Sequence, residues 1–196
     1  MAKGLALTGM TIALFAAVPS GAALASTGGS GYSPSTATTS APSTVTTSAA
    51  KPVVAGNRAK VQRNGQAAAP ANAPLTVQKM IWAANKIQTK PYVYGGGHGA
   101  IRDRGYDCSG AVSYALYYGK ILDGDPRDAV GFFSWGRSGS GDWVTVYANG
   151  EHAFVVIAGL RLDTSAINDP NQSRGPRWRK TSRDTSSFRA RHWSGL

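Results

Sequence analysis

The sequence predicts an α+β domain in which N-terminal helices pack on a small antiparallel sheet, with a disordered linker ahead of it. Three observations lead to this prediction. Residues 26–74 are dominated by small and polar side chains, two helical patterns follow between residues 76 and 119, and strand patterns begin only after residue 142. Because the helices come first and a meander of strands afterwards, the order favours an α+β domain over repeated β–α–β units.

The first 25 residues have the pattern of a secretory signal peptide. Lys3 gives a positive start, residues 5–18 are apolar and uncharged, and Ala23-Leu24-Ala25 fits a cleavage site. The alternative is a membrane anchor, but the apolar run is shorter than the roughly 20 residues that a spanning helix needs. No later segment is apolar enough to span a bilayer, so the mature chain is expected outside the membrane as a monomer without a transmembrane segment.

Residues 26–74 are predicted to form a disordered linker. Nearly every residue up to position 50 is Ser, Thr, Ala, Pro or Gly, and residues 51–74 add four basic side chains and no acidic one. Such a segment cannot bury enough apolar surface to offset the entropy lost on ordering. The remaining residues, 75–196, are long enough for one domain with its own core.

The chain is strongly basic, with a net charge of +11. Positive charge on an exported protein favours an anionic surface as its partner. The seven basic residues between Arg174 and Arg191 have the composition of a solvated face. The sequence therefore indicates no specific nucleic-acid site.

The first helix is predicted over residues 76–89. Thr76 is placed to cap its start, and Pro91 ends it. Its apolar side chains recur at helical spacing, namely Val77, Met80, Ile81, Ala84 and Ile87.

A second helix is predicted to begin at Cys108, after a glycine-rich loop at residues 95–99. Asp107 can cap this helix by accepting a hydrogen bond from an amide of the first turn. Gly119 is the expected stop. Residues 120–142 are rich in Gly, Asp and Ser and are expected to be irregular.

Strand patterns then follow. Residues 143–148 and 151–157 are joined by Asn149-Gly150, a sequence typical of a tight two-residue hairpin turn. The second of these strands is apolar throughout residues 153–157, as expected of a central strand covered on both faces. Ala158-Gly159 predicts another two-residue turn, and a last strand follows it.

Cys108 is the only cysteine of a chain that begins with an export signal. Three interpretations are open: an inert buried residue, a disulfide partner for another chain, or a nucleophile. An unpaired extracellular thiol is exposed to oxidation, which favours a chemical use for it. Its place at a helix start also favours the thiolate, although the neighbouring Asp107 opposes this unless capping amides absorb its charge.

A thiolate nucleophile needs a base and a group that orients the base. His98 in the glycine loop and His192 near the carboxyl end are both expected to be exposed. His152 opens the central strand, where a histidine is either a satisfied core residue or the base. If the turn after this strand has two residues, Asp163 shares a face with His152 and lies diagonal to it. Its carboxylate can then fix the imidazole tautomer, or alternatively pair with Arg161 or solvent.

These residues resemble those of the NlpC-type cell-wall cysteine endopeptidases of bacteria. The resemblance rests on the segments PYVYGG and YDCSG and on a strand-opening histidine some forty residues later, and it covers roughly residues 75–164. It implies a papain-like fold and cleavage of peptidoglycan stem peptides, with the D-glutamyl–diaminopimelate bond favoured. It also implies Cys108 as nucleophile, its amide as an oxyanion donor, His152 as general base and Asp163 as the orienting residue.

The same resemblance makes Tyr92, Asp107 and Ser109 candidate contacts for the free amino end of the stem peptide. The chain departs from the family in three respects. The family more often has His, Asn or Gln in place of Asp163, and it has Gly in place of Phe154, whose bulk is expected to narrow the cleft. The usual G-D-x-V-x-F block before the histidine survives only as GDWV, residues 141–144.

The sequence thus predicts a secreted or cell-wall cysteine endopeptidase, built as a signal peptide (1–25), a linker (26–74) and a peptidase domain (75–196). Its partners are expected to be peptidoglycan stem peptides and anionic wall polymers, and the residue spacing implies no metal or other cofactor. Two alternatives stay open. One is a non-catalytic wall-binding or surface protein that retains the fold, and the other is a thiol amidase or acyltransferase on the same scaffold.

Overall fold

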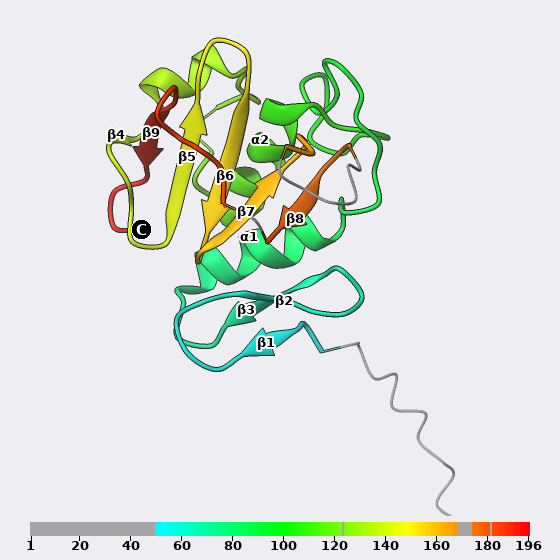
Figure 1. Ribbon diagram of the computed structural model, residues 1–196, viewed down its shortest axis with the longest axis vertical. Helices are drawn as coiled ribbons and strands as arrows, with labels where there is room; N and C mark the ends of the chain where they lie inside the picture. Colours follow the sequence, from blue (N-terminus) through cyan, green and yellow to red (C-terminus); the bar gives the residue numbers. More distant parts are fainter. Residues whose placement is uncertain (1–49, 123, 168–173, 181) are drawn as a thin grey trace, which may run out of the picture. The chain divides into compact units, whose positions relative to one another are not determined.

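The computed structural model describes residues 50–122, 124–167, 174–180 and 182–196. The predicted signal peptide and the linker up to residue 49 lie outside these ranges. The described chain begins with three short strands, which form one sheet in the order β1-β3-β2 (Figure 1). Their bounds are β1 (Val53–Val54), β2 (Lys60–Val61) and β3 (Ala67–Pro70).

Two α-helices, a 3-10 helix and a second sheet follow. The helices are α1 (Leu75–Asn85), α2 (Cys108–Gly119) and the 3-10 helix η1 (Val130–Ser134). The second sheet has the order β4-β9-β5-β6-β7-β8, and all neighbouring strands in it are antiparallel. Its strands are β4 (Arg137–Ser138), β5 (Val144–Ala148), β6 (Ala153–Ile157), β7 (Leu160–Asp163), β8 (Arg177–Arg179) and β9 (Arg189–His192).

The predicted fold class is wrong. The sequence predicted N-terminal helices on a small antiparallel sheet, as in papain-like proteins. The described residues instead hold nine strands in two sheets and two α-helices, and they begin with strands. The extra strands come from both ends of the described chain: the supposed linker supplies β1 to β3, and the basic C-terminal segment supplies β8 and β9.

The prediction of a disordered linker fails for residues 51–74 because tertiary contacts order them. Residues 67–69, all alanine, are buried, and β3 pairs with both β1 and β2. The side-chain amide of Asn85 in α1 both donates to and accepts from the backbone of Ala67, at 2.8 Å each. Small side chains let this strand lie close to α1, and its backbone groups find partners there.

The two helices lie on one face of the six-stranded sheet, where α2 contacts β6 and β7. α2 begins and ends as predicted, and the Asp107 side chain caps it by accepting a hydrogen bond from the Gly110 amide at 2.7 Å. α1 ends at Asn85, earlier than predicted, and Pro74 occupies the N-cap position predicted for Thr76. The sheet residues buried toward the helices alternate along the strands, as Val144, Val146, Val155, Ile157 and Leu162 do.

The opposite face of this sheet is crossed by the segment between β8 and β9, drawn in red in Figure 1. The crossing is required because β8 lies at one edge and β9 lies on the far side of β5. Within this segment, the Phe188 ring packs on Phe154 of β6 with 5.1 Å between ring centres. β6 is therefore covered on both faces, as its apolar run predicted.

The two turns of the meander differ in how well the sequence predicted them. Ala158-Gly159 is a two-residue turn that pairs Ile157 with Leu160, and both turn residues have positive φ (48° and 84°), as a type I′ hairpin requires. The turn at Asn149-Gly150 is longer than predicted. Ala148 pairs with Ala153, so residues 149–152 form the connection.

Candidate active site

Cys108 is the first residue of α2 and is partly buried. The glycine loop before the helix packs directly against its first turn. A Cβ atom on Gly110 would overlap the carbonyl oxygen of Gly96, whose oxygen also accepts a hydrogen bond from the Asp107 amide at 3.1 Å. Glycine at position 110 is therefore required for this close approach, and the thiol rests on a tightly packed support.

His152 directly precedes β6, in the connection formed by residues 149–152. The side-chain oxygen of Asn149 accepts hydrogen bonds from the amides of Glu151 and His152, at 3.0 and 2.9 Å. The Asn149 amide donates in turn to the His152 carbonyl at 2.9 Å. These bonds fix the backbone of His152 beside Ala153, whose amide helps to lower the pKa of the Cys108 thiol.

The His152 ring and the Cys108 thiol lie close enough to change the pKa of each other. Burial alone raises the pKa of the thiol, but the hydrogen bonds from His152 and the Ala153 amide outweigh it and hold the pKa below its ordinary value. Burial alone lowers the pKa of His152, but hydrogen bonds to Asp163 and Cys108 raise it to about 9. Both shifts favour a thiolate–imidazolium pair, the form that makes a cysteine nucleophilic.

Asp163 is the last residue of β7, and its carboxylate is fully buried. Nε2 of His152 lies 2.8 Å from its Oδ1, which leaves Nδ1 of the ring for the thiol. The strand register pairs Val155 with Leu162, so His152 and Asp163 lie diagonally on one face, as strand parity predicted. The structure thus brings Cys108, His152 and Asp163 together, while their catalytic roles stay predictions.

Two arginines surround the same carboxylate. Its Oδ2 lies 3.1 Å from Nη1 of Arg183 and 3.2 Å from Nη1 of Arg161, and its Oδ1 also accepts from the Ser165 amide at 2.8 Å. Burial alone raises the pKa of Asp163. The hydrogen bond from His152, the positive charge of His152, the Ser165 amide and the charge of Arg161 together outweigh burial and hold this pKa below its ordinary value. Asp163 is therefore an anion at neutral pH.

The crossing segment between β8 and β9 covers the imidazole–carboxylate pair. The Phe188 ring lies edge-on to the His152 ring at 6.4 Å, and the Arg183 guanidinium lies 5.4 Å from the centre of the Phe154 ring. Phe154 itself is 1% exposed and stacks on Tyr147 at 5.1 Å. Its ring therefore lies under the crossing segment, so the sequence prediction that it narrows an open cleft does not describe its place in the structure.

Of the three predicted substrate contacts, Tyr92 alone has an exposed side chain, at 41%. Burial of its hydroxyl, followed by the charges of Cys108 and Asp107, raises its pKa. Its backbone forms a β-bridge with Tyr106, two residues before Cys108. The Asp107 carboxylate is buried and occupied by the amides of Gly110 and Gly95. The buried Ser109 hydroxyl donates to the same carboxylate at 3.3 Å. Asp107 and Ser109 thus support the helix start, and Tyr92 stays open to a ligand.

His98 is a residue of this region that the sequence analysis placed on the exposed surface. It is half-buried, and its Nε2 lies 3.0 and 3.1 Å from the two carboxylate oxygens of Asp107 and 3.2 Å from the Ser109 hydroxyl. Serine and carboxylate share one ring nitrogen, whereas a Ser–His–Asp relay uses opposite nitrogens, so this trio is no second triad. The sequence did contain a signal for this contact. A helix-capping carboxylate such as Asp107 needs further hydrogen-bond donors when it is buried, and His98 in the adjacent loop can supply one. His192 lies elsewhere, with its Nδ1 3.1 Å from the carbonyl of Gly139.

The part of the chain that the structure describes holds no group of three or more His, Cys, Asp or Glu side chains arranged to bind a metal ion. Across the same described ranges, none of the helices has the length and apolar character needed to cross a membrane.

No family profile matches the sequence, and no curated protein matches it. Among solved structures, the chain is similar to that of Rv1477, a hypothetical invasion protein of Mycobacterium tuberculosis, at 18% identity and a TM-score of 0.43. The match covers 61% of this chain and 62% of the other, so the chain spans about three fifths of that structure.

Proposed function

We propose that this chain is an exported cysteine hydrolase that cleaves stem peptides of bacterial peptidoglycan. The observation that carries the proposal is the chain of contacts from the unpaired thiol of Cys108, through the His152 ring, to the buried carboxylate of Asp163. An inert core cysteine or a disulfide partner needs no imidazole of raised pKa beside it. A covalent catalyst needs a nucleophile, a base and an orienting group, and these three residues supply them.

The proposed reaction begins when the Cys108 thiolate attacks the carbonyl carbon of the scissile bond. A C–S bond forms, the carbonyl π electrons move to the oxygen, and the Cys108 amide, left free at the helix start, donates to that oxyanion. Protonated His152 gives its proton to the leaving nitrogen as the C–N bond breaks, which leaves a thioester and a free amine.

The second half of the reaction returns the enzyme to its starting state. Neutral His152 takes a proton from water, and the hydroxyl attacks the thioester carbon. The tetrahedral intermediate collapses with loss of the Cys108 thiolate, and the acyl group leaves as a carboxylic acid. Asp163 stabilises the imidazolium at both stages without taking up a proton itself.

The substrate class is supported by the sequence. The segments PYVYGG and YDCSG resemble those of NlpC-type endopeptidases, which favours the D-glutamyl–diaminopimelate bond. The net charge of +11 favours retention near anionic wall polymers, and the pattern of residues 1–25 favours export. Tyr92, exposed and close to Cys108, is the proposed contact for the stem peptide.

Digestion of purified peptidoglycan by the chain and by its Cys108→Ala variant tests the proposal. We expect the wild-type chain to release peptides with a new amino end at diaminopimelate, and the variant to release none, with mass spectrometry identifying the bond. A cut between sugar and peptide would instead indicate an amidase, and transfer of the acyl group to an added amine would indicate an acyltransferase. Equal product patterns from the two proteins would overturn the proposal.

A further inference from the structure

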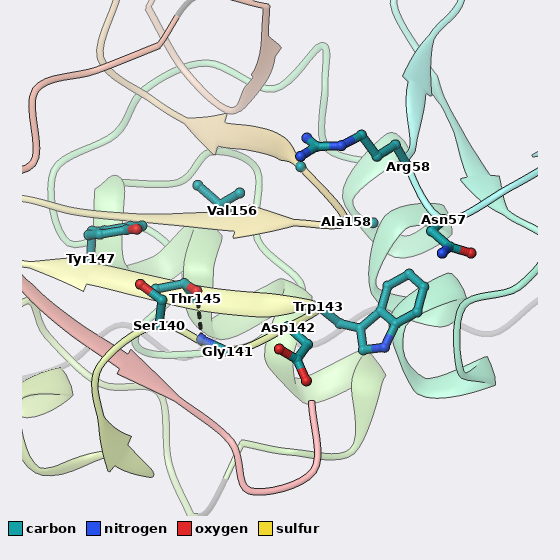
Figure 2. Close-up of a pocket in the computed structure, with 11 residues that line it drawn as sticks. Asn57, Arg58, Ser140, Gly141, Asp142, Trp143, Thr145, Tyr147, Val156 and Ala158 are labelled. Atoms are coloured by element: carbon teal, nitrogen blue, oxygen red, sulfur yellow. Dashed lines mark hydrogen bonds between the residues drawn. The ribbon is translucent and has the colours of Figure 1, made fainter.

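A cavity lies on one face of β5 and β6 and extends to the turn that follows β6 (Figure 2). Its volume is about 600 Å³, within the range of small-molecule sites. Three separate segments form its walls: residues 57–58 before β2, residues 140–143 before β5, and the turn at residues 158–159. Its floor is the sheet face that carries Thr145, Tyr147 and Val156.

Backbone hydrogen bonds hold the three wall segments together. The Ala59 amide donates to the Ala158 carbonyl at 3.0 Å, and the Ala158 amide donates to the Trp143 carbonyl at 2.7 Å. Gly159 contributes by lacking a side chain, since a Cβ atom there would lie 2.6 Å from Nη1 of Arg58. The fold itself therefore shapes the cavity and lets the guanidinium lie over the turn.

The charged groups of the cavity are available to a ligand. Within the described residues, neither Arg58 nor Asp142 forms a hydrogen bond or ion pair. The side-chain oxygen of Asn57 accepts from Asn72 at 2.9 Å, which leaves its NH₂ group free. The Trp143 indole packs against the core and lies beside Asn57 and Asp142 in Figure 2. One cation, one anion, an amide donor and an aromatic plane thus border one open space.

We infer that this cavity binds an acidic sugar, a pyranose that carries a carboxylate substituent. The apolar face of the ring matches the indole of Trp143, and its hydroxyls can donate to Asp142 and accept from Asn57. The carboxylate pairs with Arg58, whose planar guanidinium suits it. Asp142 disfavours a phosphorylated ligand, and Arg58 disfavours a cationic one, so a hydroxyl-rich monoanion fits the set best.

The Arg58 end of the cavity is separate from the candidate active site. The floor reaches Tyr147, which stacks on Phe154, but Arg58 lies over the turn at Gly159. His152 precedes β6 and Ala158 follows it, which puts about 20 Å between His152 and this turn at the rise of a strand. Even a fully extended peptide needs about six residues to span that distance. A sugar in the cavity therefore anchors the polymer at a point away from the bond that reacts at Cys108.

The sugar used to test the cavity is chosen from the substrate class of the proposed function. Peptidoglycan contains one sugar of this class, N-acetylmuramic acid, whose lactyl carboxylate is free wherever the glycan carries no stem peptide, and the choice of that sugar rests on the proposed function. N-acetylglucosamine has the same ring without the lactyl carboxylate, so it is the matched control ligand. Titration of the Cys108→Ala chain with both sugars, followed by calorimetry and by the NMR signal of the Trp143 indole, isolates the contribution of the carboxylate.

We expect N-acetylmuramic acid to bind about tenfold more tightly than N-acetylglucosamine. Arg58→Gln should abolish this preference. The Arg58 side chain is exposed, so the substitution should leave the fold intact. Arg63→Gln removes the same charge from an exposed position outside the cavity and should keep the preference. Equal affinities in the parent chain, or an intact preference in Arg58→Gln, would overturn the assignment.

Alkylation of Cys108 separates this inference from the proposed function. Slow alkylation together with a clear sugar preference would remove the hydrolase proposal and retain the cavity assignment. Fast alkylation without any sugar preference would do the reverse.

Discussion

The Nε2 atom of His152 lies 2.8 Å from Oδ1 of Asp163, although His152 precedes β6 and Asp163 ends β7. Their contact depends on register, because the two-residue turn pairs Ile157 with Leu160 and so places Asp163 diagonal to His152. A shift of one residue would turn the carboxylate to the other face of the sheet. Strand parity therefore brings His152 and Asp163 together. The carboxylate raises the pKa of His152, and His152 in turn lowers the pKa of the Cys108 thiol.

Replacing Asp163 by Asn keeps an acceptor of the same shape but removes its charge. Burial alone lowers the pKa of His152, and the hydrogen bonds to Asp163 and Cys108 raise it to about 9. The variant loses the largest upward contribution, so we expect the pKa to fall toward 6.5, its ordinary value. NMR titration of the imidazole measures this, with the exposed Asp125→Asn as the control. A His152 pKa that stays near 9 in Asp163→Asn would show that the Asp163 carboxylate does not cause the raised value.

The same variant should also change how stability depends on pH. Burial alone raises the pKa of Asp163, but His152, Ser165 and Arg161 hold it below its ordinary value. Such a group stabilises the fold above its unfolded pKa of about 3.9, and this stability is lost as pH falls through the folded pKa. At pH 7 the neutral amide removes the negative charge that faces the buried Arg161 and the partly buried Arg183, and the free energy of unfolding should fall by about 3 kcal/mol.

Urea denaturation at pH 7 and at pH 3 measures that difference. The gap between wild type and Asp163→Asn should narrow at the lower pH, because the wild-type carboxylate loses its advantage there. A gap of equal size at both pH values would contradict the assignment of Asp163 as a buried anion.

Replacing His152 by Gln should make Cys108 less reactive. Burial raises the pKa of the thiol, as does Asp107, and the variant removes the hydrogen bond and charge of His152 that lower it. We expect the rate of iodoacetamide labelling at pH 7 to fall by about tenfold or more, and its pH profile to move upward. His192→Gln removes a histidine away from the site and should leave the rate unchanged. A wild-type chain that labels no faster than its unfolded form would end the nucleophile assignment.

The relationship between His152 and Asp163 could be derived from the sequence because it depends on local chemistry. The Asp107 cap sets the start of α2, and the Ala158-Gly159 turn sets the register of β6 and β7. Each of these signals comes from a few neighbouring residues whose side chains or φ angles decide the outcome.

The parts that could not be predicted depend on contacts between distant residues. β9 pairs with β5, as in the contact of Arg191 with Val146, and no local pattern distinguishes this strand from a basic solvated tail. β3 is a run of alanines that is ordered by Asn85 of α1. In both cases the tertiary partner supplies the stabilisation that composition alone does not show.

Arg183 should contribute more to stability than an exposed arginine that makes a similar ring contact. It donates to the buried Asp163 at 3.1 Å and lies 5.1 Å from the Phe188 ring centre. Arg189 also lies over a ring, that of Phe133 at 4.4 Å, but it is exposed. We expect Arg183→Met to lower the free energy of unfolding by about 2 kcal/mol, and Arg189→Met by less than about 1 kcal/mol.

Arg183→Lys separates charge from shape in this contact. Lysine keeps the positive charge but lacks the planar guanidinium. The free energy of unfolding of Arg183→Lys should therefore lie between those of the parent chain and of Arg183→Met. Urea denaturation of the three variants supplies the comparison. Equal losses for Arg183→Met and Arg189→Met would show that the bond to Asp163 adds nothing to the ring contact.

Gly110 provides a test of how rigidly the thiol is supported. Alanine in a helix interior is ordinarily more stable than glycine by about 1 kcal/mol. At this position the added Cβ would overlap the carbonyl oxygen of Gly96 and lie 3.1 Å from Oδ1 of Asp107. Backbone cannot yield as a flexible side chain can, so overpacking of about 1–3 kcal/mol should outweigh the helix preference.

We therefore expect Gly110→Ala to lower the free energy of unfolding and to slow the alkylation of Cys108, since moving the loop disturbs the Asp107 cap. Gly99→Ala lies in the same loop, and nothing lies within 4 Å of an added Cβ there, so it should match the parent chain in both measurements. If Gly110→Ala proved as stable and as reactive as the parent, the glycine loop would be free to shift. The reactivity of Cys108 would then depend on His152 alone and not on the packing of the helix start.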